Sequence, residues 1–149
     1  MDFNDIASSL IAAFNGHDAE RLVSLYTDDQ VTVLPGAPEP VRGRKSKAEM
    51  VAGYFRAFPD LKLEIPLVLV SGDHIVCAGH MAGTNTGPLV SPEGEMPPTG
   101  RLVEIPMAFI LRVRPDGPIE EDQTYFDEAE FLKQLGLRQA RTPDRADVS

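Results

Sequence analysis

The stretch that decides the fold class reads LKLEIPLVLV at residues 61–70, SGD at 71–73 and HIVCAGHMAGT at 74–84. From Leu61 to Leu69 every second residue is apolar, and lysine, glutamate and proline occupy positions between them. Alternation of this kind is typical of a strand with one buried face. Because SGD favours a turn, residues 74–84 are expected to return as the second strand of a hairpin.

Two more strands follow. Residues 101–114, RLVEIPMAFILRVR, alternate in the same way, and PDGP turns the chain into IEEDQTYFD at 119–127. Between the two pairs, residues 85–100 are rich in proline and glycine, which predicts a long loop. Four strands joined largely by turns predict an antiparallel sheet.

Helices are expected mainly before these strands. Apolar residues at a spacing of three or four predict a first helix over 3–15, and Asp18 is suited to cap a short second helix with Leu22, Leu25 and Tyr26 on one side. A short strand, QVTVL, is expected at 30–34. Ser46 and Glu49 form a capping-box pattern that predicts a third helix ending before Pro59.

The order of elements predicts an α+β domain in which three N-terminal helices pack against a curved, cone-shaped antiparallel sheet, with a short C-terminal helix. A chain of 149 residues is long enough for one such domain, expected over residues 1–137. Residues 138–149 contain almost no large apolar side chains, which predicts a disordered tail.

Composition limits the function classes. A formal net charge of −9 argues against nucleic acid as a partner, and the basic run RGRKSK at 42–47 is interpreted as a solvated segment. No apolar run is long enough to span a membrane, and the acidic start MDFNDIASSL is unlike a signal peptide, so we expect a cytoplasmic protein. Cys77 is interpreted as a core residue. The three histidines lack metal-ligand spacing, so no metal is expected.

Five short strings in order resemble the SnoaL-like polyketide cyclases of the nuclear-transport-factor-2-like superfamily. They are FNGHD at 14–18, AFPDLKLE at 57–64, AGTNTGPL at 82–89, PPTGRLVEI at 97–105 and YFDEAEFLKQLGL at 125–137. The resemblance covers nearly the whole chain except the tail. It implies the cone-shaped α+β fold, and a fold of this kind hosts both enzymes and binding proteins.

The resemblance also implies an activity. Family members close rings of polyketide-like substrates without a cofactor: a carboxylate removes a proton from the carbon beside a carbonyl, and a proton later returns to the new alkoxide. Such a base needs an apolar setting, and the developing enolate needs hydrogen-bond donors. We therefore expect an acid/base cyclase or isomerase that binds a small apolar molecule. We also expect a homodimer formed through the outer face of the sheet, where Val68, Val70 and Ile110 are expected.

Asp127 is the first candidate for the base, because the family's aspartate lies on or just after the last strand. The residues themselves allow another interpretation. Asp127 and Glu130 form the D-x-x-E pattern of a helix start, and a carboxylate that accepts helix N–H groups is held ionised and is a weak base. Both alternatives remain open from the sequence.

Asp122 and His80 are the other catalytic candidates. Alternation along the last strand places Asp122 with Glu120, Thr124 and Phe126 on one side, and Glu121 with Gln123, Tyr125 and Asp127 on the other. The acidic run at 120–122 is otherwise typical of a solvated face. His80 could serve as a proton partner, although the last strand but one lacks the histidine that the family places there.

A mostly apolar pocket is expected, lined by Phe14, Tyr26, Phe55, Met107, Phe109, Gln123 and Tyr125. Two other functions remain open. The protein could be a noncatalytic binding module with the same pocket, or an epoxide hydrolase if Arg112 or Arg114 joined two aspartates around a water molecule.

Overall fold

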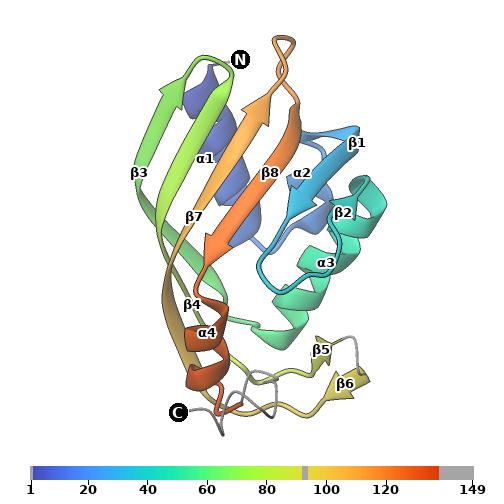
Figure 1. The fold of residues 1–149 in the computed structure, drawn as a ribbon, viewed down its shortest axis with the longest axis vertical. Helices are drawn as coiled ribbons and strands as arrows, with labels where there is room; N and C mark the ends of the chain where they lie inside the picture. The colour runs from blue at the N-terminus through green and yellow to red at the C-terminus, as the bar shows by residue number, and fades with distance from the viewer. Residues whose placement is uncertain (1, 92–93, 138–149) are drawn as a thin grey trace, which may run out of the picture.

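A computed structural model describes residues 2–91 and 94–137. In these residues a strongly curved six-stranded sheet has the order β2-β1-β8-β7-β4-β3, and a small separate hairpin pairs β5 with β6 (Figure 1). The expected α+β class and curved sheet are confirmed. The strands are β1 (Tyr26–Val33), β2 (Val41–Arg42), β3 (Lys62–Ser71), β4 (His74–Thr84), β5 (Leu89–Ser91), β6 (Gly94–Met96), β7 (Leu102–Val113) and β8 (Ile119–Phe126).

The sheet is mixed rather than wholly antiparallel, which corrects one expectation. The four long strands β3, β4, β7 and β8 are antiparallel neighbours, as their turns predict. However, β1 pairs with β8 in parallel, with Thr32 opposite Asp122. The first strand of the chain therefore lies beside the last, and turn chemistry carries no information about such a long-range pairing.

The first two helices are α1 (Phe3–Asn15) and α2 (Ala19–Val23). The bounds predicted for α1 are confirmed, and it packs against β3. The Asp18 cap of α2 is also confirmed, since its carboxylate accepts a hydrogen bond from the Arg21 N–H at 3.0 Å. The helix is shorter than expected: Tyr26 does not continue it but begins β1, where its side chain is buried.

The third helix, α3 (Arg44–Ala57), begins before the expected capping box. Gly43 stands at the N-cap with a φ of 86°, and no side chain caps the helix, so the prediction of a Ser46–Glu49 capping box was wrong. The N–H of Gly43 instead bonds to the carbonyl of Gln30 at 2.9 Å. This tertiary contact holds the helix start against β1. The last helix, α4 (Glu128–Gln134), follows β8 directly.

A bulge in β3 corrects the simple alternation expected for residues 61–69. The pairing register with β4 shifts between Glu64 and Leu67. Leu63 before the bulge is buried, whereas Leu67 and Leu69 after it are 46% and 54% exposed. Val68, expected on the outer face, packs against the core. One extra residue in a strand moves all later side chains to the opposite face, which explains why Leu67 and Leu69 are exposed while Val68 packs inside.

Two apolar clusters stabilise the domain. The larger lies between the six-stranded sheet and the helices α1 and α2, and includes Ile6, Leu22 and Leu111. The smaller lies near the C-terminal ends of α3 and α4, and includes Phe58, Ile105 and Leu135. In Figure 1 the helices α1, α2 and α3 all lie on the concave side of the sheet.

Within the described ranges no helix has the length and apolar character needed to cross a membrane. The single-domain assignment for residues 1–137 remains a prediction. The tail predicted at 138–149 lies outside the residues that the structure describes.

Candidate active site

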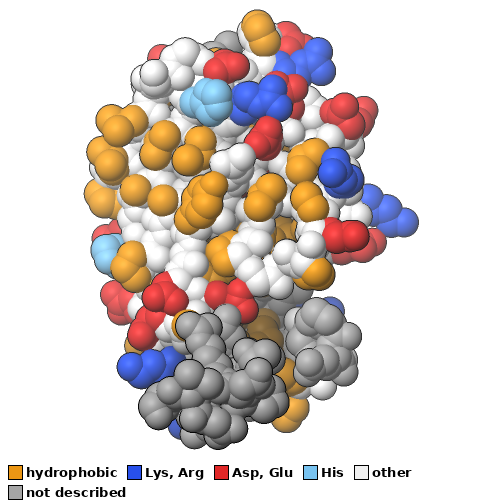
Figure 2. All heavy atoms as spheres, viewed as in Figure 1, with side chains coloured by type: hydrophobic (Ala, Val, Ile, Leu, Met, Phe, Trp, Pro, Cys, Tyr) orange, Lys and Arg blue, Asp and Glu red, His pale blue; other side chains and the backbone are white. Residues whose placement is uncertain are grey.

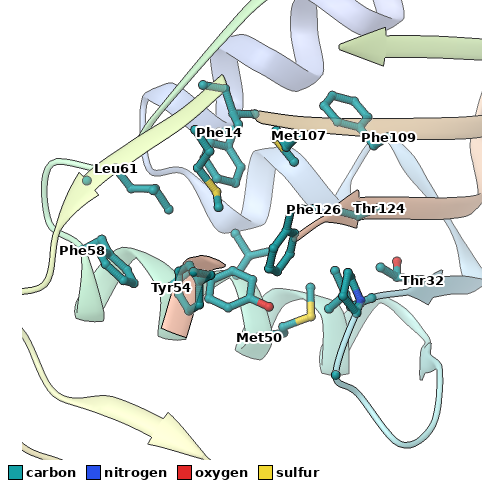
Figure 3. A pocket seen from close by; sticks show the side chains of 18 of the residues that line it. Phe14, Thr32, Met50, Tyr54, Phe58, Leu61, Met107, Phe109, Thr124 and Phe126 are labelled. Atoms are coloured by element: carbon teal, nitrogen blue, oxygen red, sulfur yellow. The ribbon is translucent and has the colours of Figure 1, made fainter. Parts of the chain in front are cut away.

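A cavity of about 330 Å³ lies between the concave face of the sheet and the helices. Its walls are mostly apolar: Phe14 comes from α1, Tyr54 from α3, Met107 and Phe109 from β7, and Phe131 from α4. Figure 3 shows aromatic rings and methionine side chains from α1, α3, β7 and β8 converging on one space. A largely apolar cavity with a few polar groups is typical of a small-molecule site.

Four lining residues that are each at most 6% exposed form the part of the cavity that we call its inner end: Tyr26, Thr32, Lys47 and Asp122. Asp122 is the carboxylate of this end. Its side chain lines the cavity, and the residue is only 6% exposed. Oδ2 accepts hydrogen bonds from the Tyr26 hydroxyl at 2.7 Å and from the Lys47 ammonium at 3.2 Å, and Oδ1 accepts one from the Thr124 hydroxyl at 3.0 Å. Three donors from three elements therefore fix the orientation of this carboxylate.

Lys47 reaches the same place from the first turn of α3. The residue is 3% exposed, and its Nζ lies 2.6 Å from Thr32 Oγ1, 3.2 Å from Asp122 Oδ2 and 4.2 Å from the centre of the Tyr26 ring. Burial lowers the pKa of Lys47, and the neighbouring Asp122 charge opposes that change. Burial, followed by the Asp122 charge, raises the pKa of Tyr26 well above its usual value, so its hydroxyl stays a donor.

A chain of hydrogen bonds behind Lys47 determines which atoms donate. The amide nitrogen of Gln30 donates to the carbonyls of Val41 and Gly43, so its Oε1 is free to accept from the Thr32 hydroxyl at 2.6 Å. Because the Thr32 proton is used in that bond, its oxygen accepts from Lys47. The network thus makes Lys47 the donor to Thr32 and holds its Nζ beside Asp122.

The structure separates the two competing carboxylates, Asp122 on β8 and Asp127 just after it. Asp127 is exposed and accepts a hydrogen bond from the Glu130 N–H at 3.0 Å, which makes it the N-cap of α4. It is not among the residues that line the cavity. Asp122 faces the cavity together with Thr124 and Phe126. The sequence left open which side of β8 faces the pocket, and in the structure it is the side that carries Asp122.

His80 is not brought to Asp122. It is exposed on β4, where the alternating neighbour Met81 lines the cavity. Because adjacent side chains of a strand point to opposite faces, His80 lies on the outer face. The geometry gives it no contact with a ligand in the cavity.

Of the seven expected pocket residues, Phe14, Tyr26, Met107 and Phe109 line the cavity. Phe55 does not, and instead stacks on the imidazole of His17 with ring centres 4.3 Å apart. Gln123 and Tyr125 lie on the other side of β8, where the Tyr125 hydroxyl donates to Gln123 and the Gln123 amide donates to Glu121.

Sequence reasoning missed Lys47 by assigning it to a solvated basic run. A usable signal was present, since Lys47, Val51, Tyr54 and Phe58 recur at three or four residues and therefore share one face of α3. A lysine on the apolar face of a helix is buried only if it finds a partner. Thr32 was also missed, because its partner Lys47 is distant in the sequence.

A second carboxylate, that of Glu128, lines the cavity at the start of α4. It covers the backbone of Gly36, where a Cβ would clash with it. Among the described residues no group of three or more His, Cys, Asp and Glu side chains is arranged to hold a metal ion. Arg112 and Arg114 do not reach the cavity; they pair with Glu120 and Glu121, and with Asp116, respectively.

The family model described as SnoaL-like polyketide cyclase matches residues 4–135. The chain belongs to the SnoaL-like polyketide cyclase family. This match spans all the elements that build the cavity, and it confirms the family resemblance of the sequence. No curated protein gives a significant match.

Three solved structures are similar to this chain. IdmH of Streptomyces antibioticus, a proposed polyketide cyclase, is 32% identical, with a TM-score of 0.73 over 92% of this chain and 100% of that chain. AclR of Streptomyces galilaeus, a proposed hydroxylase, is 21% identical, with a TM-score of 0.75 over 98% and 92%. A Catenulispora acidiphila protein with a ketosteroid isomerase-like fold is 24% identical, with a TM-score of 0.75 over 93% and 98%. The last two show the fold alone.

Proposed function

We propose that this SnoaL-like protein is a cofactor-independent cyclase or isomerase in which Asp122 is the general base. The observation that carries the proposal is the position of Asp122: a carboxylate held by three donors at the inner end of an apolar cavity. The 32% identity to a proposed polyketide cyclase supports the same reaction class. The resemblance first favoured Asp127 as the base; its position as an exposed helix cap favours Asp122 instead.

The reaction begins with enolisation. The bond between hydrogen and the carbon next to a substrate carbonyl breaks, the proton passes to a carboxylate oxygen of Asp122, and the electron pair moves onto the carbonyl oxygen to give an enolate. In an aldol closure, the enolate carbon then bonds to a second carbonyl carbon of the same molecule. The alkoxide formed there takes the proton back from Asp122, so no external acid or base is consumed.

The substrate is an apolar molecule with an enolisable carbonyl. Aromatic rings and methionine side chains around the cavity favour a flat, weakly polar body, and the inner end offers hydrogen bonds to its carbonyl. A bicyclic ketone such as 2-tetralone is a suitable generic probe, because exchange of its acidic C–H hydrogens for deuterium reports enolisation without knowledge of the natural substrate.

The test compares 2-tetralone exchange in deuterated buffer, followed by NMR, for the wild type, Asp122→Asn and Asp127→Asn. We expect faster exchange with the wild type and with Asp127→Asn, and loss of the enzyme-dependent rate with Asp122→Asn. Binding of 2-tetralone to Asp122→Asn should be nearly unchanged. Loss of exchange in Asp127→Asn alone would instead assign the base to Asp127.

A noncatalytic binding module is the second candidate function. It is favoured by the ion pair between Asp122 and Lys47, because a carboxylate occupied by an ammonium and two hydroxyls is less available as a base. Binding of 2-tetralone and related ketones without any enzyme-dependent exchange would support this alternative over the cyclase.

The protein is further proposed to form a homodimer through the outer face of its sheet. The outer patch consists of apolar or aromatic side chains on four adjacent strands: Leu67, Leu69, Val76, Ala78, Ala108, Ile110 and Tyr125. Figure 2 shows hydrophobic side chains gathered over this part of the sheet, with charged groups above and below them. Large contiguous apolar patches mark interaction sites, and an identical copy supplies a matching apolar surface.

A further inference from the structure

Lys47 has an unused donor at the inner end of the cavity. Its ammonium carries three N–H groups, and in the described part of the chain two oxygens accept from it, Thr32 Oγ1 and Asp122 Oδ2. The remaining contact is the face of the Tyr26 ring. Lys47 lines the cavity, so a ligand oxygen can complete its hydrogen bonding.

From this geometry we propose that Lys47 is a catalytic residue that binds the substrate's carbonyl oxygen and stabilises it as an enolate. The proposal rests on the proposed function, since it concerns the charge that forms when Asp122 removes a proton. It also narrows the substrate class to compounds whose enolisable C–H lies directly beside the carbonyl that enters the inner end.

The spacing of the two groups fits this role. In a ketone, the carbon that loses the proton and the carbonyl oxygen that gains the charge are separated by only two bonds. Base and oxyanion donor must therefore lie side by side, and Lys47 Nζ is 3.2 Å from Asp122 Oδ2. A substrate can place its C–H against the carboxylate and its oxygen against the ammonium at the same time.

The charge balance also fits. Asp122 becomes neutral when it takes the proton, while one negative charge appears on the substrate oxygen. The buried Lys47 ammonium thus has one neighbouring anion before the transfer and one after it. A buried cation without a counter-ion raises the free energy of the complex. An enolate oxygen beside Lys47 avoids this, because its negative charge replaces the one that Asp122 loses.

The supporting contacts keep Lys47 aimed at this point. Thr32, fixed by Gln30, holds one side of the ammonium, and the Tyr26 ring covers another at 4.2 Å. Preorganised donors of this kind stabilise charge in a transition state because they do not have to reorient.

The experiment uses 2-naphthol as a stable, apolar mimic of the enolate, because its hydroxyl ionises to an aromatic oxyanion that absorbs at a different wavelength. Titration of bound 2-naphthol is compared in Asp122→Asn and in the double variant Lys47→Met/Asp122→Asn. Both lack the carboxylate, so neither leaves a buried anion unpaired. Lys45→Met/Asp122→Asn is the matched control, since Lys45 is an exposed lysine on the same helix.

In Asp122→Asn we expect the pKa of bound 2-naphthol to fall at least one unit below that of the free compound, which is a tenfold or larger preference for the anion. The Lys45 control should behave in the same way. The Lys47 double variant should bind 2-naphthol without that shift. Thermal unfolding of each variant checks that it is folded at the temperature of the titration.

Equal pKa values of bound 2-naphthol with and without Lys47 would overturn the proposal, as would binding of the neutral form alone by Asp122→Asn. These outcomes differ from failure of the proposed function. If 2-tetralone exchange is absent but the naphtholate shift depends on Lys47, the base assignment fails and the oxyanion site stands.

Discussion

The hydroxyl of Tyr26 donates a 2.7 Å hydrogen bond to Oδ2 of Asp122, and this bond joins the first residue of β1 to the middle of β8. Both residues are buried. The contact depends on the parallel pairing of β1 with β8, which brings two residues far apart in the chain to one end of the cavity. The inner end of the site therefore depends on the long-range topology of the sheet.

Tyr26→Phe should destabilise the fold, because it removes a donor from a buried carboxylate. Hydrogen bonds to charged groups contribute about 1.5–3 kcal/mol, so the free energy of unfolding should fall by about that amount. Urea denaturation measures the change. Tyr125→Phe is the matched control, since the Tyr125 hydroxyl also donates to a β8 side chain but is exposed; it should change stability by less than about 0.5 kcal/mol. Equal effects would contradict the importance of the buried bond.

Cys77 should make the fold less stable at alkaline pH. Burial, with a contribution from the Asp122 charge, raises the pKa of its thiol from 9.0 to about 11. Below pH 9 the thiol is protonated in both folded and unfolded chains, and its contribution is complete. Between pH 9 and 11 only the unfolded chain loses the proton, so stability falls as pH rises, by roughly 2–3 kcal/mol in total.

Cys77→Ala tests this dependence. The variant loses some stability at pH 8 because it leaves a small cavity, but its stability should fall less between pH 9 and 11 than that of the wild type. Urea denaturation at a series of pH values provides the comparison. Tyr54, whose pKa is also raised by burial, remains in both proteins and contributes equally. The Cys77 thiolate helps to raise the pKa of Tyr26, so loss of Cys77 changes the Tyr26 contribution in the same direction as the expected difference. Parallel pH profiles for the two proteins would refute the role of Cys77.

Gly87→Ala should disturb the segment that covers the cavity. The Gly87 N–H donates to the carbonyl of Ala57, and a Cβ at Gly87 would collide with the backbone carbonyl of Arg56. Leu89 and Val90, which follow closely, line the cavity. We expect a loss of about 1–3 kcal/mol in unfolding free energy and weaker 2-tetralone binding, measured by urea denaturation and ligand titration.

Gly53→Ala is the control for Gly87→Ala. Gly53 lies within α3 with open space around its Cα, so alanine there should increase stability by up to about 1 kcal/mol through its higher helix propensity. Ligand binding should be unaffected. A destabilised Gly53→Ala, or an unchanged Gly87→Ala, would show that the backbone contacts around α3 are not those described.

Leu69→Lys should dissociate the proposed homodimer. Leu69 is 54% exposed within the outer patch, and a charge there would be buried between two copies. Sedimentation equilibrium should report a dimer for the wild type and a monomer for the variant. Leu102→Lys is the matched control, because Leu102 is similarly exposed, at 60%, but lies at the opposite end of β7 from the patch. A monomeric wild type would end the dimer proposal.

Local patterns predicted much of the fold and part of the site. Periods of two and of three to four located the four long strands and α1, because side-chain burial repeats with the geometry of each element. The caps at Asp18 and Asp127 were also readable, since each depends on bonds within a few residues. Phe14, Tyr26, Met107 and Phe109, which were expected at a pocket because they are large and apolar, line the cavity of the structure.

Other features depended on contacts between distant segments. The bulge in β3 turned Val68 toward the core and Leu67 and Leu69 toward the outer face. The parallel pairing of β1 with β8 placed Thr32 opposite Asp122. From the sequence Lys47 was interpreted as a solvated lysine, but in the structure α3 places it beside Thr32 and Asp122. The amino-acid sequence by itself determined the family, the fold class and the apolar character of the pocket, because these follow from local periodicity and motifs. Only the tertiary structure decided that Asp122 rather than Asp127 faces the cavity, because the pairing of β8 between β1 and β7 sets which side of the strand is covered by helices.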